Sequence, residues 1–369
     1  MDIQFEPIKN KRLAQAKWAY TTRRINHEQE FYLLSGKLAP LPGDLLLARV
    51  TEIGQHKRLE LATSRRATLF EGDEIVVAYG NRYAPDQFEG IVPDNLGPCR
   101  LVAAGGVAAR QLNRNDRIRP ATRITPLGLL ADKDGQRINL SSARLPKTDQ
   151  RNYKPLVVVV AGSSMNSGKT TTCANLVKGF VRQNIKVAAA KFTGTGAGAD
   201  YRALVDAGAD PVFDFIDAGY VSTYRVNRDA LLDIATTLGT AMCATQPDII
   251  VIEIADGLLQ RETAQVFGTP AFTDWIDGVI FVAGEALGAQ AGISWLKARQ
   301  LPVFAISGLL TSSPLARREA EEACGLPVYH TNALAHANVS QYIYNCLKFR
   351  KQRRLELAKG STVKFEVPG

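Results

Sequence analysis

The chain has 369 residues, a length that suggests about two domains because single hydrophobic cores rarely grow past roughly 250–300 residues. A hydrophobic fraction of 46% and a charged fraction of 22% are ordinary for globular proteins and exclude a largely disordered chain. The net charge of +9 is uneven: residues 1–154 carry 25 Lys+Arg and 17 Asp+Glu, whereas residues 155–347 carry 13 and 17.

Segments that would direct the chain to a membrane or out of the cell are not evident. No apolar run approaches the ~18–20 residues of a membrane span, and the start, MDIQFEPIKNKR, lacks the apolar stretch of a secretory signal. The five cysteines lie far apart without a Cys-x-x-Cys pair, which disfavours a disulfide framework or a thiolate zinc site. We therefore expect a cytoplasmic protein without a membrane partner.

Residues 1–146 are predicted to form a basic, mostly-β domain. Short alternating runs recur about ten residues apart between Gly/Asp turns, which favours a small barrel or sandwich. The expected strands are Asp44–Ile53, Arg58–Thr63, Glu74–Tyr79, Cys99–Ala104 and Arg137–Leu140. Lys11–Ile25 is compatible with a short helix. The stretch Tyr79–Glu89 is dense in aromatic and polar residues; a packed turn is favoured there over a recognition loop.

Residues 147–155 are polar and Pro-flanked and are predicted to be a linker. From residue 156 to 369 strands and helices alternate, which predicts an α/β domain with a doubly wound parallel sheet. The expected strands are Leu156–Ala161, Ile185–Phe192, Ile249–Ile254, Gly278–Ala283 and Val303–Ile306. The expected helices are Gly168–Gln183, Ala199–Ala207, Asp229–Thr245, Ala291–Gln300 and Ser313–Cys324, and a basic C-terminal helix that continues Gln341–Leu347 and stops at Gly360.

The most informative motif is a small-residue loop between the first of these strands and the first helix. Such a loop exposes backbone N–H groups, and the helix N-terminus adds unpaired donors, so phosphate oxygens can bind there. A lysine in the helix can reach the β- and γ-phosphates, and the next hydroxyl can bind Mg²⁺. The sequence therefore predicts a site for ATP or another NTP with Mg²⁺, formed by Gly162, Ser163, Ser164, Met165, Asn166, Ser167, Gly168, Lys169, Thr170 and Thr171.

The spacing of this loop departs from the commonest phosphate-binding loop. Five residues instead of four separate Gly162 from Gly168. In this respect GSSMNSGKT resembles the P-loop NTPases of the dethiobiotin synthetase and cobyrinic acid synthase branch, and the resemblance extends through residues 156–330. A second P-loop family, which contains D-glutamate N-acetyltransferase, is similar at Asp210–Gly219 and around Glu253. Neither resemblance covers residues 1–150.

The resemblance implies roles for three residues beyond the loop. Lys191 matches a lysine that contacts phosphate and substrate, Asp200 matches an acidic Mg²⁺ ligand, and Glu253 matches a Mg²⁺-binding glutamate. Mg²⁺ prefers oxygen ligands and keeps several waters, so Thr170, Asp200 and Glu253 would be a sufficient protein contribution. Lys169, Lys191 and Glu253 are the predicted catalytic residues. The adenine-reading asparagine of dethiobiotin synthetase is absent at Ala305–Gly308, which leaves the nucleobase open.

Further residues are candidates for binding the substrate. The stretch from Thr193 to Gly198 offers either backbone donors to an anion or a plain connection, and the candidates in it are Thr193, Gly194 and Thr195. Asp214 and Asp217 follow a predicted strand, and one of them is expected to be a site residue and the other a cap or turn former. Asp256 either contacts substrate or makes a turn.

Three functions fit this sequence. The first is an ATP- and Mg²⁺-dependent enzyme that phosphorylates, and so activates, a carboxylate or similar anionic group of a small metabolite. The second is a coenzyme A-dependent N-acyltransferase of an amino acid, by analogy with the D-glutamate enzyme. The third is a nucleic-acid-dependent ATPase or polynucleotide kinase, suggested by the basic N-terminal region but not favoured. A homodimer is expected by analogy with related P-loop proteins.

Overall fold

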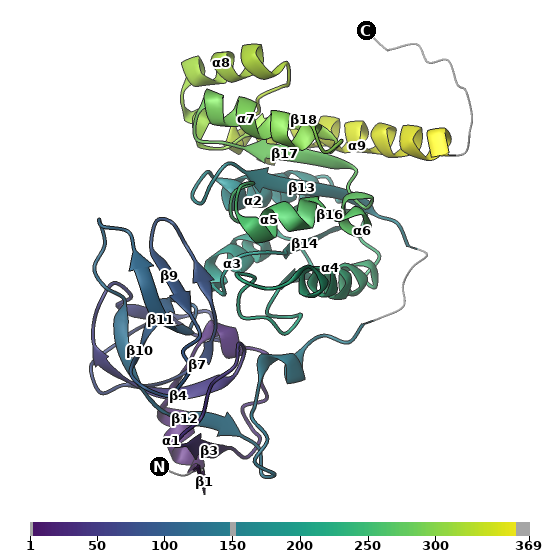
Figure 1. Ribbon diagram of the computed structural model, residues 1–369. Helices are drawn as coiled ribbons and strands as arrows, with labels where there is room; N and C mark the ends of the chain where they lie inside the picture. The colour runs from purple at the N-terminus through teal and green to yellow at the C-terminus, as the bar shows by residue number, and fades with distance from the viewer. Residues whose placement is uncertain (1–2, 148–152, 359–369) are drawn as a thin grey trace.

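The computed structural model describes residues 3–147 and 153–358, which form a β-rich part and an α/β part stacked on each other (Figure 1). Within these residues no helix is both long and apolar enough to cross a membrane. The predicted linker 147–155 lies mostly outside the described residues, as do the expected helix stop at Gly360 and the rest of the C-terminal tail.

Strands of the N-terminal part form one sheet that closes on itself. Pairings run from β12 to β4, β7, β11 and β10 and back to β12, all antiparallel except β7 with β11. The strands are β1 (Gln4–Pro7), β2 (Lys17–Trp18), β3 (Tyr32–Ser35), β4 (Leu45–Glu52), β5 (Arg58–Glu60), β6 (Arg66–Thr68), β7 (Glu74–Tyr79), β8 (Arg82–Tyr83), β9 (Phe88–Ile91), β10 (Cys99–Ala103), β11 (Val107–Arg114) and β12 (Thr122–Ala131). This closed ring leaves its five strands without a free edge, as in a small barrel.

The barrel strands bury both faces. On β4, Leu45 and Leu47 belong to one apolar cluster, and Leu46 and Ala48 belong to a second on the opposite face. This follows from the two-residue period of strand side chains, and it explains why β4 begins as an unbroken Leu45–Ala48 apolar run.

Two local predictions in this part are wrong. Lys11–Ile25 is not one helix: helix α1 (Asn10–Gln15) is followed by β2 and the short 3₁₀ turn η1 (Tyr20–Thr22). Arg137–Leu140 makes only isolated strand bridges. There the Asn139 side chain accepts a hydrogen bond from Ser141 N, which starts the 3₁₀ turn η2 (Leu140–Ala143) instead of continuing a strand.

The α/β part is built on a six-stranded parallel sheet in the order β15-β14-β16-β13-β17-β18. Its strands are β13 (Leu156–Gly162), β14 (Val187–Lys191), β15 (Val212–Asp214), β16 (Ile249–Glu253), β17 (Gly278–Val282) and β18 (Val303–Ser307). The helices are α2 (Lys169–Val181), α3 (Gly198–Ala207), α4 (Arg228–Cys243), α5 (Arg261–Phe267), α6 (Pro270–Thr273), α7 (Ala286–Lys297), α8 (Pro314–Cys324) and α9 (Ala337–Ala358), with 3₁₀ turns η3 (Leu309–Ser312) and η4 (Thr331–Ala335).

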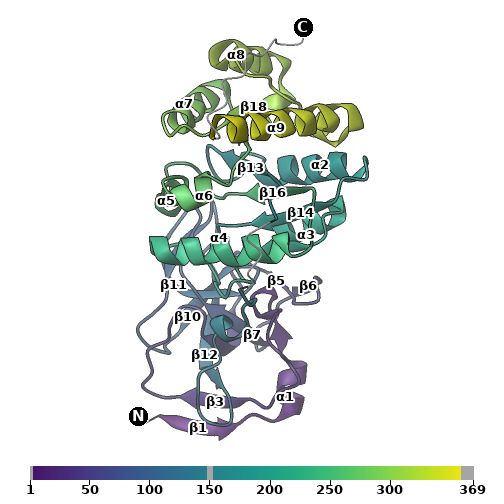
Figure 2. The same ribbon diagram turned by 90° about the vertical axis from the view of Figure 1, so that its right-hand side faces the viewer.

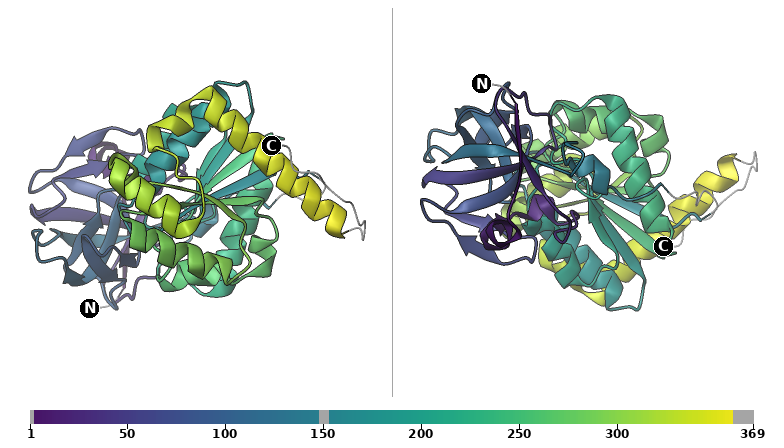
Figure 3. Two further views of the ribbon diagram at one scale, coloured as in Figure 1. Left: turned by 90° about the horizontal axis from the view of Figure 1, so that it is seen from above. Right: turned by 90° about the horizontal axis from the view of Figure 1, so that it is seen from below.

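Helices cover both faces of this sheet, as the sequence predicted. The odd-numbered residues of β13, such as Val157 and Val159, pack with α4 to α7, and the even-numbered Val158 and Val160 pack with α2, α3 and α9. Figure 2 shows α4 running alongside β14 on one face of the sheet. In Figure 3 the barrel occupies one side of the α/β part, and α9 projects past the body on the other side.

The register of the sheet brings the expected functional residues together. Glu253 ends β16 opposite Lys191, which ends β14, and it also pairs with Val160 of β13, two residues before the phosphate loop begins at Gly162. In open α/β sheets ligands bind at the carboxyl ends of the strands, and this is the edge that faces the barrel.

Candidate functional site

The loop between β13 and α2 presents a row of backbone donors. In the described part of the chain, none of the N–H groups of residues 164–171 donates a hydrogen bond to a protein atom. Gly168 has a φ of 99°, which a glycine adopts without steric cost, and Asn166 has a φ of 60°. Consecutive N–H groups left free at a helix N-terminus form an anion-binding concavity.

Lys169 closes over this loop. Its side chain is only 6% exposed, and its Nζ donates to the Ser164 carbonyl oxygen at 2.7 Å. Burial lowers the pKa of Lys169, and the carboxylates of Glu253 and Asp256 oppose that shift. The ammonium is thus held beside the free N–H groups by one backbone bond, which an incoming phosphate oxygen can replace.

Not every residue of the predicted loop faces the site. Met165, Asn166 and Gly168 line the cleft described below, together with Lys169, Thr170 and Thr171. Ser163 instead donates its N–H to the Val282 carbonyl oxygen on β17 at 2.9 Å, so this donor is already used.

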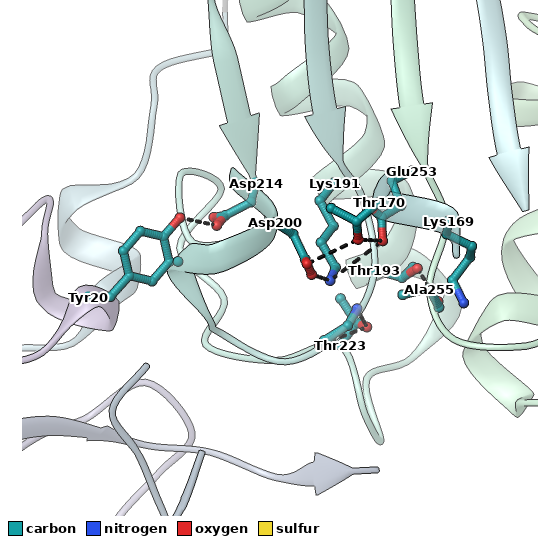
Figure 4. Close-up of polar contacts among 12 residues, drawn as sticks. Tyr20, Lys169, Thr170, Lys191, Thr193, Asp200, Asp214, Thr223, Glu253 and Ala255 are labelled. Carbon is teal, nitrogen blue, oxygen red and sulfur yellow. Dashed lines mark hydrogen bonds and ion pairs between the residues drawn. The ribbon is translucent and has the colours of Figure 1, made fainter. Parts of the chain in front are cut away.

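Next to the loop, one hydroxyl, one ammonium and two carboxylates converge (Figure 4). Thr170 Oγ1 lies 3.0 Å from Asp200 Oδ1 and 3.1 Å from Glu253 Oε1. Lys191 Nζ forms an ion pair with Asp200 and lies 3.8 Å from Glu253 Oε1. The four residues come from α2, β14, α3 and β16, so the strand order of the sheet creates the cluster.

The lysine and the carboxylates of this cluster oppose one another electrostatically. Burial favours the neutral form of Lys191, but Asp200 and Glu253 outweigh it and raise the lysine's pKa. Burial likewise acts against the charge of Asp200, and Lys191 overcomes it, so the pKa of Asp200 is lowered. Burial dominates at Glu253 and raises its pKa. Lys191 and Lys169 therefore compensate the charge of Asp200 but not that of Glu253.

Residues of this cluster fit a bound Mg²⁺. Glu253 Oε2 is buried and has no hydrogen-bond partner among the described residues. The Thr170 hydroxyl carries a single proton, so it can donate to Asp200 or to Glu253 but not to both. The described residues contain no group of three or more His, Cys, Asp or Glu side chains that could hold a metal. Two carboxylates and a hydroxyl suit Mg²⁺, which keeps several waters and draws further ligands from phosphates.

The barrel forms the opposite wall of the site. A cleft of ≈ 890 Å³ is lined on one side by the loop, Lys191, Asp200 and Glu253, and on the other by barrel residues. The polar residues of the barrel side are Gln55, His56, Lys57, Arg58, Glu60, Arg66, Arg82, Tyr83 and Gln87, and four of its five charged side chains are basic. The excess positive charge of the N-terminal part therefore lies in part against the phosphate loop.

The β8–β9 hairpin ties this wall to the loop. Asn166 Nδ2, at the tip of the phosphate loop, donates to Asp86 Oδ2 at 2.6 Å. At the other end of the hairpin Tyr224 donates to Glu89 at 3.0 Å, and its ring lies 5.6 Å from that of Tyr83. The stretch Tyr79–Glu89, for which a packed turn was favoured, thus contacts the phosphate loop directly.

The other substrate candidates from the sequence divide into two groups. Gly194, Thr195 and Asp256 line the cleft, and burial raises the pKa of the Asp256 carboxyl. Thr193 does not line it: its hydroxyl donates to the Ala255 carbonyl oxygen, to which Thr263 also donates. Thr193 therefore holds the Ala255 backbone in place and does not line the cleft, so its contact with substrate stays a prediction.

Asp214 and Asp217 lie away from the cleft, at the junction between the barrel and the α/β part. Arg23 Nη2 lies 2.8 Å from Asp214 Oδ1 and 2.6 Å from Asp217 Oδ2, and Tyr20 donates to Asp214 at 2.6 Å (Figure 4). Both aspartates are buried, at 2% and 4% exposure, outside the cleft lining. Their partners lie about 190 residues earlier in the chain, so the sequence offered no way to recognise this interdomain ion pair.

The polar site residues that sequence reasoning missed belong to the barrel wall, above all His56, Lys57, Arg58, Arg82 and Gln87. The signals were the basic excess of residues 1–154 and the unusual density of polar groups in residues 79–89. Neither signal indicates that these residues face a loop 80 or more positions further along the chain.

Residues 153–358 have the architecture of a P-loop fold: a parallel sheet, a strand–glycine loop–helix unit, and free N–H groups beside the buried Lys169. No protein-family model matches the chain, and no curated protein matches it. The particular branch that the sequence resembles is thus not confirmed and stays a prediction.

Solved structures show a distant likeness. The signal recognition particle 54 kDa protein of Aeropyrum pernix K1, in complex with GDP, matches with a TM-score of 0.37 and 19% identity, over 57% of this chain and 52% of that chain. The receptor FtsY of Elizabethkingia anophelis with GDP matches with a TM-score of 0.36 and 18% identity, over 55% and 66%. Chloroplast FtsY of Physcomitrella patens gives 0.34 and 17%, over 56% and 70%. A likeness of this degree supports no conclusion about activity.

Proposed function

We propose that this chain is a Mg²⁺-dependent enzyme that transfers the γ-phosphoryl group of ATP, or of another nucleoside triphosphate, to an anionic oxygen of a small metabolite. The observation that carries the proposal is the single cleft that joins the free N–H groups of residues 164–171, the Lys191–Asp200–Glu253 cluster and a basic second wall. The basic side chains of that second wall supply donors for an anionic acceptor opposite the phosphate loop.

The proposed mechanism relies on positioning and charge. The loop N–H groups and Lys169 would bind the β- and γ-phosphates, and Thr170, Asp200 and Glu253 would hold Mg²⁺, which would neutralise charge on the phosphates when bound. Lys191 lies beside the cluster, where its ammonium would stabilise charge that develops on the transferred group. Asp256 and the basic barrel wall face the same space, so the acceptor would bind between them and the phosphate loop.

The test is nucleotide consumption against a panel of small carboxylates, with Mg²⁺ and with ATP or GTP as donor. We expect one or more acceptors to raise phosphate transfer above background. Lys169→Ala should abolish that rise, and Lys178→Ala, on the same helix and away from the cleft, should leave it intact. Turnover by Lys169→Ala at the parent's rate would refute the proposal.

A further inference from the structure

Arg82 is an unusual buried charge in the barrel wall. Its side chain is 5% exposed, and it lines the cleft opposite the phosphate loop. No carboxylate of the described residues lies within ion-pair distance of it, whereas Arg23, the other deeply buried arginine at the domain junction, pairs with two. A buried ion without a counter-charge costs several kcal/mol, so such groups are normally paired.

The hydrogen bonds of Arg82 are also incomplete. Nη2 donates to Gln87 Oε1 at 2.9 Å, and Nε is buried without a partner among the described residues. Nη1 lies 3.3 Å from His56 Nε2, but that nitrogen also lies 3.0 Å from the Val102 carbonyl oxygen. One neutral imidazole nitrogen cannot donate to Val102 and accept from Arg82 together. The guanidinium therefore keeps N–H groups that no protein acceptor of the described residues satisfies, on Nε and on Nη1.

The side chains that Arg82 contacts, His56 and Gln87, carry no negative charge. Burial, then the charge of Arg82, lowers the pKa of His56 to about 4, so this ring is neutral at physiological pH. Burial lowers the pKa of Arg82 to about 10, and Asp256 across the cleft is the acid that opposes the shift. Arg82 is still charged at neutral pH. Lys57 and Arg58, exposed at the rim of the same cleft, add positive charge.

We propose that Arg82 binds a second anionic group, a carboxylate or phosphate, of the acceptor substrate, so that the acceptor carries at least two anionic groups. This inference rests on the proposed function: one anionic group reacts near Lys191, and the other anchors the molecule to the barrel. A guanidinium offers planar, paired donors that match the two oxygens of such a group. The barrel is then the acceptor-binding domain, and the P-loop domain binds the nucleotide.

Thermal unfolding of the full chain tests this assignment. Saturating Mg²⁺ and the β,γ-imido analogue of ATP fill the site of the terminal phosphate, and succinate or inorganic phosphate is then added as the anion probe. In the parent, we expect the probe to raise the midpoint of thermal unfolding further. In Arg82→Met, we expect the apparent affinity for the probe, taken from the same midpoints, to be at least tenfold weaker. Arg100→Met, a barrel arginine outside the cleft, should respond like the parent. The stronger of the two probes identifies a carboxylate or a phosphate as the anchored group.

Arg82→Met also has a distinctive expected effect without ligand. Removal of an uncompensated buried charge should leave the midpoint equal or raise it, because an apolar side chain of similar length fits a buried site better. A clearly lower midpoint would show that the fold itself needs Arg82 and would overturn the inference. So would a parent that responds to neither probe, or an unchanged probe response in Arg82→Met.

Two outcomes separate this inference from the proposed function. If the parent shows no midpoint shift with the Mg²⁺–nucleotide analogue, the proposed function fails. The other outcome is a normal shift with the nucleotide analogue in the parent, a smaller shift with that analogue in Arg82→Met, and no change in the response to the anion probe. Arg82 would then bind the terminal phosphate of the nucleotide, and its assignment to the acceptor would be wrong.

Discussion

At the scale of single residues, the site combines groups that the sequence identified with groups that it could not. Lys169 and Thr170 could be predicted because their chemistry depends on a short local spacing, and Lys191 and Glu253 because parallel strands end at one edge of a sheet. Arg82 could not be predicted, because it stands out only as a buried arginine without a carboxylate partner, and burial and pairing are seen only in the folded structure. The contacts of Asp214 could not be predicted either, because its partners Tyr20 and Arg23 are distant in sequence.

Lys191 tests the charge balance of the cluster. Lys191→Met removes the ammonium that faces Asp200 and Glu253, so the two carboxylates should repel and the protein should lose stability without Mg²⁺. Added Mg²⁺ should restore most of the lost thermal midpoint, while phosphoryl transfer should stay reduced by about 100-fold. Calorimetry with and without Mg²⁺ measures the first effect, and Lys178→Met is the control. If the thermal midpoint of Lys191→Met does not change when Mg²⁺ is added, the assigned metal site is wrong.

His56 makes a pH-dependent contribution to stability. Burial lowers its pKa in the folded protein to about 4, below the ~6.5 of an exposed histidine. As the pH falls from about 6.5 to about 4, the unfolded chain takes up a proton at this residue before the folded chain does, so the free energy of unfolding must decrease over that window.

The variant His56→Gln should lose that part of the pH dependence. Urea unfolding at several pH values between 4.5 and 7.5 should show a flatter profile for His56→Gln than for the parent, by of order 2 kcal/mol across the window. Gln55→Ala, at a neighbouring residue that does not titrate, serves as the control and should keep the parent's slope. Parallel profiles for parent and His56→Gln would contradict the prediction.

At the scale of elements, glycines allow the two domains to meet closely. Gly105, between β10 and β11, lies against the backbone of Gly196, and a Cβ on Gly105 would overlap the Gly196 carbonyl oxygen. The sequence offers Gly105-Gly106 as a turn, and the stretch from Thr193 to Gly198 as either backbone donors to an anion or a plain connection. It could not show that these two glycine segments pack on each other, because the packing joins separate domains.

Gly105→Ala should therefore act on the domain contact. We expect a loss of about 1–3 kcal/mol in the free energy of unfolding, because backbone atoms cannot move aside as a flexible side chain can. Gly284→Ala is the matched control, since a Cβ there meets no atom within 4 Å. Denaturant unfolding of both variants decides the matter. Equal stability of the two variants would mean that the domains do not meet as described.

At the scale of the whole molecule, the two domains are joined as one unit through buried charges. Arg23 bridges Asp214 and Asp217, Glu60 of the barrel accepts from Gly198 N at the start of α3, and Arg144 lies 2.9 Å from Asp233 on α4. The sequence predicted the P-loop domain and its sheet but treated the N-terminal part as a separate unit. The composition gives the net charge of each half of the chain. Only the folded molecule shows that some basic residues of the N-terminal half face the phosphate loop of the other half.

Arg23→Ala should uncouple the domains. It leaves Asp214 and Asp217 buried without their main counter-charge, which costs about 3–5 kcal/mol. The thermal unfolding of the parent should be a single transition, and that of the variant should separate into two. Arg49→Ala, which removes an exposed pair with Glu74, should cost at most about 1 kcal/mol and keep a single transition. An Arg23→Ala profile like that of Arg49→Ala would contradict this view of the junction.

The central claim is that the phosphate loop and the barrel wall form one site, and the most direct test is a crystal structure with Mg²⁺ and the β,γ-imido analogue of ATP. The account predicts a triphosphate bound by the N–H groups of residues 164–171 and by Lys169, with Mg²⁺ beside Thr170 and Glu253. It also predicts that the terminal phosphate points across the cleft towards the barrel. A nucleotide bound elsewhere, or a terminal phosphate that points away from the barrel wall, would contradict it.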